Sequence, residues 1–177
     1  MRVIGALVPL LLCFFAHASE LRDDGVAPTA QLRQGELSAP TPLQIPGARL
    51  IATSELRALM SGAPESRPVL FDVLGGDGHL SLPGAIWLPG AGRGSSFEDE
   101  TQVHLAKLLD LVTRGDRRRT LVFFCASPTC WLSYNAALRA AQLGYEDVRW
   151  YRGGIEAWRA AGGPVTELRV VWKRPAG

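Results

Sequence analysis

Two cysteines, Cys125 and Cys130, are the side chains of this 177-residue chain with the clearest chemical potential. The segment Cys125-Ala-Ser-Pro-Thr-Cys130 directly follows an apolar run over residues 120–124, which is typical of a strand covered on both faces of a parallel sheet. Ligands of such sheets bind beyond the carboxyl ends of the strands. The position therefore predicts that Cys125 is a reactive thiol at the functional edge of a sheet.

A helix is predicted directly after this loop, because one face of the segment carries Tyr134, Ala137, Leu138 and Ala141. The first N–H groups of a helix lack partners within it, and here they point at the loop. Because these donors favour negative charge, we expect Cys125 to ionise more readily than a free cysteine. The alternative is that Cys125 is a small buried apolar residue at the end of a strand.

Cys130 has three open interpretations. The two cysteines could form a disulfide, as in oxidising compartments, although closing so small a loop adds little stability. Cys130 could instead resolve a mixed disulfide or persulfide on Cys125, or it could be a core residue in the first turn of the helix. We favour a chemical role over a structural one, with Cys125 and Cys130 as the catalytic residues. The loop backbone and pocket wall expected to contact substrate are Ala126, Ser127, Thr129 and Trp131.

The remaining polar residues predict no cofactor, no metal and no nucleic-acid partner. Two cysteines supply half of a zinc site, and His79 and His104 are too isolated to complete it. The glycine-rich stretch at 75–78 lacks the Lys-Ser/Thr ending of a phosphate loop. The formal net charge is only +2, and the basic run at 114–119 is typical of a solvated loop.

The amino-terminal residues predict export. Arg2 precedes a nearly uninterrupted apolar run over residues 3–15, and Ala16 and Ala18 are the small residues that a signal peptidase reads. The run is shorter than the roughly 18 to 20 residues needed to cross a bilayer, so no membrane span is expected after cleavage. We therefore expect residues 1–18 to be a cleaved signal peptide and the mature protein to lie in the periplasm.

The rest of the chain predicts one α/β domain. Residues 19–45 are rich in Pro, Ala, Gly and polar side chains, which indicates an extended leader, and residues 169–177 are expected to be a tail. Within 46–168, strand and helix patterns alternate with short connections, which predicts an open parallel sheet with helices on both faces. Asp72 ends one predicted buried strand and is expected to orient the neighbouring loop.

Three segments of this domain resemble the single-domain rhodaneses, a family of sulfurtransferases. Leu70-Phe71-Asp72-Val73 resembles the family's early strand, and Leu82-Pro83-Gly84-Ala85-Ile86 resembles its Ile-Pro-Gly-Ala motif. The segment from Tyr151 to Trp158, with paired glycines before Ala-Trp, resembles its closing signature. The resemblance implies a rhodanese-like fold and places the family's catalytic cysteine at Cys125, as a nucleophile that carries sulfur as a persulfide.

Several family features are missing from the chain. No basic residue lies between Cys125 and Asn135, where the family's loop often has one, and Cys130 occupies that region. Leu74 stands where an arginine often follows Asp-Val, and His79 is displaced from the family's histidine position. Thiosulfate:cyanide transfer is therefore not the physiological reaction that we expect.

Cys-x4-Cys-Trp followed by residues 133–137 is similar to a periplasmic rhodanese-like group that is associated with PQQ-dependent catabolism. The resemblance implies a setting and not a substrate. The partners that we expect are a sulfur donor or acceptor thiol and a periplasmic partner protein. Three hypotheses follow: a sulfur carrier or sulfurtransferase that uses Cys125, a thiol-disulfide redox protein that uses both cysteines, and a non-catalytic accessory module of a PQQ-dependent oxidation system.

Overall fold

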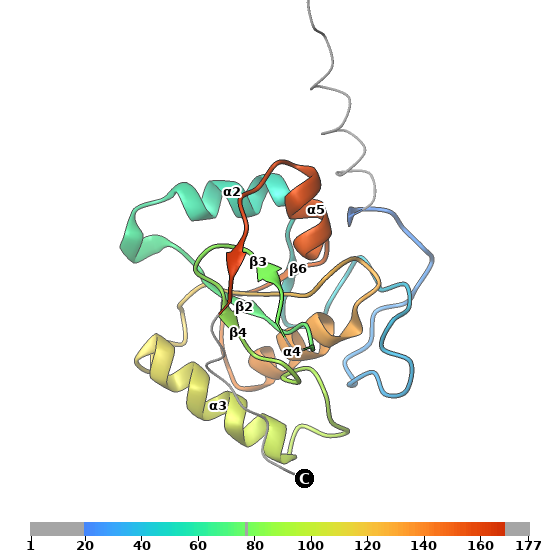
Figure 1. The fold of residues 1–177 in the computed structure, drawn as a ribbon. Coiled ribbons are helices and arrows are strands. Elements are labelled where there is room, and N and C mark those ends of the chain that lie inside the picture. Colours follow the sequence, from blue (N-terminus) through green and yellow to red (C-terminus); the bar gives the residue numbers. More distant parts are fainter. Residues whose placement is uncertain (1–19, 77, 169–177) are drawn as a thin grey trace, which may run out of the picture.

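The computed structural model describes residues 20–76 and 78–168, with a parallel sheet of five strands at the centre (Figure 1). The strand order is β1-β6-β5-β2-β4, and every neighbouring pair is parallel. The strands are β1 (Arg49–Leu50), β2 (Val69–Asp72), β4 (Ile86–Trp87), β5 (Leu121–Phe124) and β6 (Val148–Tyr151). All four residues of the central strand β5 are buried, as its apolar sequence predicts.

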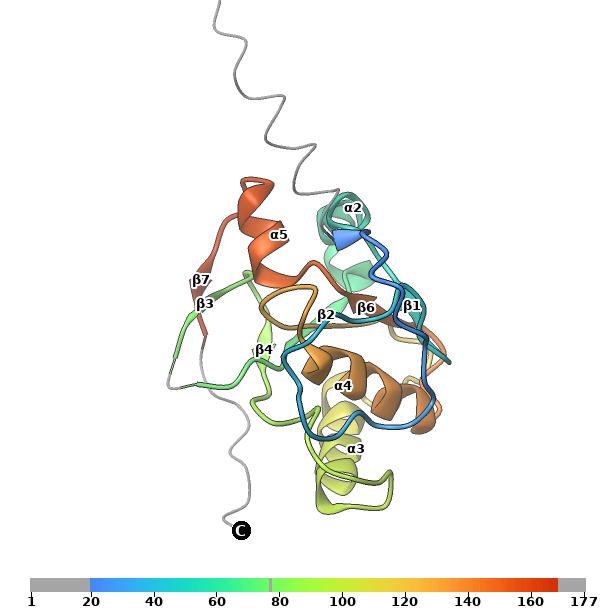
Figure 2. The same cartoon turned by 90° about the vertical axis from the view of Figure 1, so that its right-hand side faces the viewer.

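Helices cover both faces of the sheet, which confirms the predicted open parallel α/β fold. On one face lie α3 (Glu100–Thr113) and α4 (Trp131–Gln142), and on the other lie α2 (Thr53–Ser61) and α5 (Gly154–Ala160) (Figure 2). Successive strand side chains alternate between the two faces. Phe71 and Phe123 stack on the face of α3 and α4, while Leu70 and Val122 belong to the core beneath α2 and α5.

Three short elements could not be predicted, because their sequences carry no clear pattern. Strands β3 (Leu80–Ser81) and β7 (Thr166–Glu167) pair antiparallel beside the main sheet, and a 3-10 turn, η1, covers Pro64–Ser66. Two-residue strands are too short to show a hydrophobic alternation, so only the pairing itself identifies them.

The segment expected as an extended leader lies against the domain without regular secondary structure (Figure 2). Leu32 and Ile45 are buried in the core on the face of α3 and α4. The Glu20 carboxylate accepts hydrogen bonds from the backbone N–H and the hydroxyl of Thr53, and so caps the start of α2. The signal peptide and tail predicted from sequence fall outside the described residues.

The buried guanidinium of Arg152 fastens this segment to the end of β6. It donates to the carbonyl oxygens of Glu20, Arg22 and Thr41, to the Thr41 hydroxyl and to the Asp24 carboxylate. Burial lowers the pKa of Arg152, and the Asp24 carboxylate opposes that effect. No helix within 20–76 and 78–168 is long and apolar enough to span a membrane.

Replacing this anchor should release the amino-terminal segment. We expect Arg152→Gln to lower the free energy of unfolding by about 3 kcal/mol, because it leaves buried carbonyl groups without donors. Urea unfolding measures the loss, and limited proteolysis should locate new cleavage within residues 20–41. Arg118→Gln is the matched control, since the Arg118 side chain is 82% exposed. Equal stability of the two variants would contradict the anchoring role.

Candidate active site at the end of the central strand

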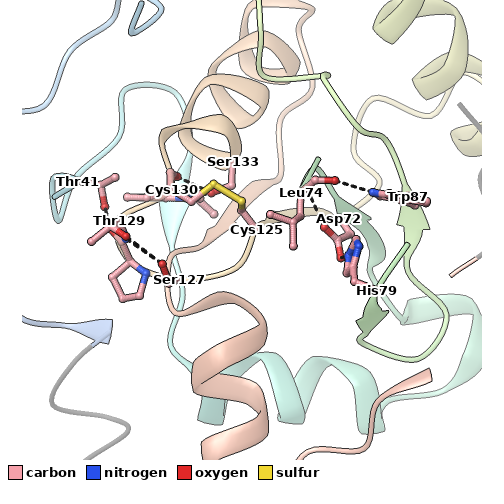
Figure 3. The surroundings of a disulfide bond; sticks show 12 residues. Thr41, Asp72, Leu74, His79, Trp87, Cys125, Ser127, Thr129, Cys130 and Ser133 are labelled. Atoms are coloured by element: carbon pink, nitrogen blue, oxygen red, sulfur yellow. Dashed lines mark hydrogen bonds and ion pairs between the residues drawn. A yellow bond between two sulfur atoms is a disulfide. The ribbon is translucent and has the colours of Figure 1, made fainter. Parts of the chain in front are cut away.

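The two cysteines are joined in a disulfide at the carboxyl end of β5 (Figure 3). Cys125 directly follows β5, and Cys130 is the residue that precedes the first turn of α4. Their Sγ atoms are 2.07 Å apart and their Cα atoms 6.2 Å apart. Cys125 is only 1% exposed, whereas Cys130 is partly exposed. The structure thus brings the two predicted catalytic residues together at the predicted edge of the sheet.

The first turn of α5 holds one side of the cysteine loop. The N–H of Ile155 donates to the Cys125 carbonyl at 3.0 Å, and the N–H of Glu156 donates to the Ala126 carbonyl at 2.9 Å. Gly154 has a φ of +62°, and a Cβ there would lie 2.4 Å from the Cys125 carbonyl oxygen. Only glycine permits this approach. The second glycine of the Gly153-Gly154 pair is therefore explained by its contact with the cysteine loop.

Residues 37–41, which we name the N-terminal strap, hold the opposite side of the loop. Ser38 forms an antiparallel bridge with Cys130, and the N–H of Ala39 donates to the Thr129 carbonyl at 2.9 Å. The Thr41 hydroxyl donates to the Pro128 carbonyl. The cysteine loop is thus fixed between two segments that are distant from it in sequence.

A cavity of about 420 Å³ opens beside the disulfide. Both cysteines line it, as do the predicted substrate-contacting residues Ala126, Ser127 and Thr129. The other lining residues come from the strap region, from the loops after β2 and β4, and from the first turn of α4: Gly35, Leu37, Ser38, Leu74, Arg93 and Leu132. A thiol at this position can therefore meet a small molecule or an inserted partner side chain.

Comparison with known proteins decides the family. The family model described as rhodanese-like domain matches residues 53–161, which include both cysteines and all the strands of the central sheet except β1. The chain belongs to the rhodanese-like domain family. None of the curated proteins matches it significantly.

Solved structures of similar fold include three bacterial proteins. The BH2092 protein from Bacillus halodurans is 25% identical with a TM-score of 0.47, and the match covers 73% of this chain and 77% of that one. The Alr3790 protein from Anabaena is 23% identical with a TM-score of 0.44, over 67% and 80% of the two chains. A thiosulfate sulfurtransferase from Pseudomonas aeruginosa is 21% identical with a TM-score of 0.49, over 70% and 21%.

Within this rhodanese-like site, Arg93 brings a positive charge that the cysteine loop lacks. It is the one charged residue among those that line the cavity in the described part of the chain. Its backbone is held by α4, because Arg139 donates to the Arg93 carbonyl at 2.7 Å and Asn135 donates to the Gly92 carbonyl at 2.9 Å. Sequence reasoning missed Arg93, since nothing local connects the loop after β4 with the cysteines.

The loop that carries Arg93 depends on a buried ion pair between Arg139 and Asp99. The Arg139 guanidinium is fully buried and lies 2.7 Å from the Asp99 carboxylate. Burial alone would raise the pKa of Asp99, but the hydrogen bonds from Arg139 and from the N–H of Gln102, together with the Arg139 charge, hold it below its usual value. The ionised form of Asp99 is therefore favoured by the fold.

Asp72 has the orienting role expected from its place at the end of β2. Its carboxylate accepts hydrogen bonds from the N–H of Leu74 at 2.9 Å and from the Ser81 hydroxyl, and it pairs with His79 Nε2 at 2.8 Å (Figure 3). The Leu74 carbonyl accepts a further bond from Trp87 at 2.6 Å. These contacts fix Leu74 in the cavity wall. His79, although displaced in sequence from the family's position, still reaches the aspartate.

Trp131 does not line the cavity, which corrects its expected place in the pocket wall. Its ring is 2% exposed and packs edge-on against Tyr134, and its Nε1 donates to the Pro40 carbonyl at 3.1 Å. Trp131 therefore anchors the N-terminal strap, and Leu132 supplies the apolar wall instead. Within the described residues, no group of three or more His, Cys, Asp or Glu side chains is arranged to hold a metal ion.

The Asp99 ion pair predicts a specific acid sensitivity. Because its folded pKa is lowered, Asp99 contributes its full stabilisation above the unfolded pKa of about 3.9, and loses it as pH falls through the folded pKa. We expect Asp99→Asn to cost about 2 kcal/mol at pH 7 and to flatten the fall in the free energy of unfolding below pH 4. Urea unfolding at several pH values tests this, with exposed Asp110→Asn as control. Parallel pH curves for wild type and Asp99→Asn would rule it out.

Proposed function

We propose that this rhodanese-like protein is a periplasmic sulfur carrier or sulfurtransferase in which Cys125 forms a persulfide and Cys130 resolves it. The observation that carries the proposal is the bond between the two Sγ atoms at the end of β5. A Cys130 thiol that can bond Cys125 Sγ is also placed to attack that sulfur when it carries a persulfide. The family membership supports sulfur transfer as the chemistry.

The proposed cycle balances without a cofactor. The Cys125 thiolate attacks the sulfane sulfur of a donor, and the rest of the donor leaves with the electron pair of the broken bond. The terminal sulfur then passes to an acceptor thiol. Alternatively, the Cys130 thiolate attacks Cys125 Sγ, which forms the disulfide and expels the terminal sulfur as hydrosulfide. An external thiol reductant restores both cysteines.

The apolar walls of the cavity favour a donor with an organic part, and Arg93 is the basic side chain in the lining that would meet an anionic group on that donor. The cysteine loop carries no basic side chain, and Pro128 offers no N–H to an anion. Leu37, Leu74 and Leu132 give the cavity apolar walls. We propose an organic persulfide or polysulfide as the donor and a thiol, free or on a periplasmic partner protein, as the acceptor.

Intact mass spectrometry tests the persulfide. After reduction and treatment with a polysulfide or an organic persulfide, Cys130→Ser should gain one sulfur and keep it, because the resolving thiol is missing. Wild type should instead release hydrosulfide and return to the disulfide, and Cys125→Ser should show neither result. If Cys130→Ser gains no sulfur from any of these donors, the sulfur-carrier function is excluded.

The disulfide itself favours a second candidate, a thiol-disulfide redox protein without sulfur transfer. In that case Cys125 and Cys130 cycle between dithiol and disulfide, and they either oxidise a partner dithiol or reduce a partner disulfide. We expect the purified protein to lose two hydrogens on mild oxidation, and we expect a serine at either position to prevent that loss. Repeated oxidation of a dithiol, with a small disulfide as the terminal oxidant and no sulfur donor present, would favour this candidate. A single oxidation without turnover would count against it.

The third candidate is a non-catalytic accessory module of a PQQ-dependent oxidation system. Its support is the Cys-x4-Cys-Trp sequence and the missing basic residue in the loop. This role would be favoured if neither a persulfide nor redox turnover were observed while deletion of the protein still impaired growth on a substrate of such a system.

A further inference from the structure

We infer that external thiols exchange with the disulfide at Cys130, that Cys125 is the leaving thiolate, and that Arg93 favours thiols that carry negative charge. The inference deepens the proposed function and rests on it, because it concerns the step that reduces the disulfide.

Cys125 is more deeply buried than Cys130, as expected if external thiols attack Cys130. Cys125 is 1% exposed and belongs to the core on the face of α3 and α4, whereas Cys130 is partly exposed. In Figure 3, Leu74 lies on the side of Cys125 away from Cys130, and Leu74 also lines the cavity. An incoming thiolate must approach a sulfur along the line of the S–S bond. Cys130 is thus the more accessible target.

The surroundings of Cys130 hold that residue still while the bond is exchanged. Its backbone pairs with Ser38 of the N-terminal strap, and its carbonyl accepts a hydrogen bond from the Ser133 hydroxyl at 3.1 Å. The N–H of Trp131 donates to the Leu37 carbonyl at 3.0 Å. Cys125 lies at the other end of the loop, directly after β5, where its burial in the core keeps its sulfur from direct attack.

The exchange is balanced. A thiolate bonds to Cys130 Sγ, the S–S bond breaks, and its electron pair leaves on Cys125 as a thiolate. A second external thiolate then attacks the external sulfur of the mixed disulfide. This step releases Cys130 as a thiolate and the two external thiols as a disulfide. Both cysteines are reduced, and both external thiols are oxidised.

Arg93 gives the cavity its charge preference. The guanidinium has no ion pair or hydrogen bond to a side chain or backbone group within the described residues, although its backbone is fixed by Arg139 and α4. Ion pairs explain the positions of the Arg139 and Arg152 side chains, whereas none within residues 20–76 and 78–168 involves Arg93. Arg93 is the single charged side chain among the described residues that line the cavity, and its charge matches a thiol that bears a carboxylate.

Peptide mapping after partial reduction tests which of the two sulfur atoms the external thiol attacks. The oxidised protein is mixed briefly with 2-mercaptoethanol, quenched with acid, alkylated with N-ethylmaleimide and digested with trypsin. One peptide, Thr120–Arg139, contains both cysteines, and fragment ions between them assign each modification. We expect the mixed disulfide on Cys130 and the alkyl group on Cys125, in about tenfold excess over the reverse arrangement. Equal amounts, or an excess of adduct on Cys125, would overturn the inference.

Single-cysteine variants provide a measurement that does not depend on a short-lived adduct. The thiols of Cys125→Ser and Cys130→Ser are each titrated with a neutral aromatic disulfide, and their rates are compared at the high-pH plateau where each thiol is fully ionised. Cys130, in Cys125→Ser, should react about ten times faster because access limits the other thiol. Similar plateau rates would contradict the proposed difference in access.

Three matched thiols test the role of Arg93: anionic 3-mercaptopropionate, neutral 2-mercaptoethanol and cationic cysteamine. Arg93→Gln should slow reduction by the anionic thiol about two- to fivefold, leave the neutral one unchanged and speed the cationic one. Arg118→Gln removes the same charge at an exposed site and should change none of these ratios. Equal effects of the two variants would refute the charge preference. These assays contain no sulfur donor, so they can fail while the persulfide test succeeds, and the reverse also holds.

Discussion

The burial of β5 on both faces is the constraint on which the rest of the molecule depends. A strand with four buried apolar residues needs a helix layer on each side, and it needs parallel neighbours, β2 and β6, to satisfy its backbone. The chain must then leave the core at the carboxyl end of β5, between α4 on one face and α5 on the other. The cysteine loop occupies that exit, so the same constraint that builds the sheet also fixes where the thiols lie.

Two buried arginines hold the irregular segments that surround the site. Arg139 on α4 fastens the loop after β4, and Arg152 after β6 fastens the segment from Glu20 to Thr41. Each guanidinium satisfies carbonyl groups that would otherwise be buried without a donor. Loops without regular structure can therefore form the rim of a defined cavity, because side chains of the regular core supply their hydrogen bonds.

Sequence patterns predicted the parts of the structure that depend on local periodicity. Local signals are present in the apolar run at β5, in the helical spacing of α4 and in the paired glycines before α5. The predicted fold and the predicted proximity of Cys125 to Cys130 both rest on these signals. Arg93, the N-terminal strap and the pairing of β3 with β7 depend on contacts between distant segments. No spacing rule connects Arg93 to Cys130. The orientation of the Trp131 side chain could not be predicted for the same reason. It depends on contact with the N-terminal strap, whose composition indicated only an extended leader.

The bridge between Ser38 and Cys130 also bears on the order in which the molecule folds. The disulfide closes a loop of only a few residues, so its loop-closure entropy is small and it can form early. The strap must find a partner that is far away along the chain, and contacts of such high sequence separation form slowly. The thiol pair can therefore be oxidised before the strap is in place. Because Leu37 and Ser38 of the strap line the cavity, its walls are complete only after this slower contact has formed.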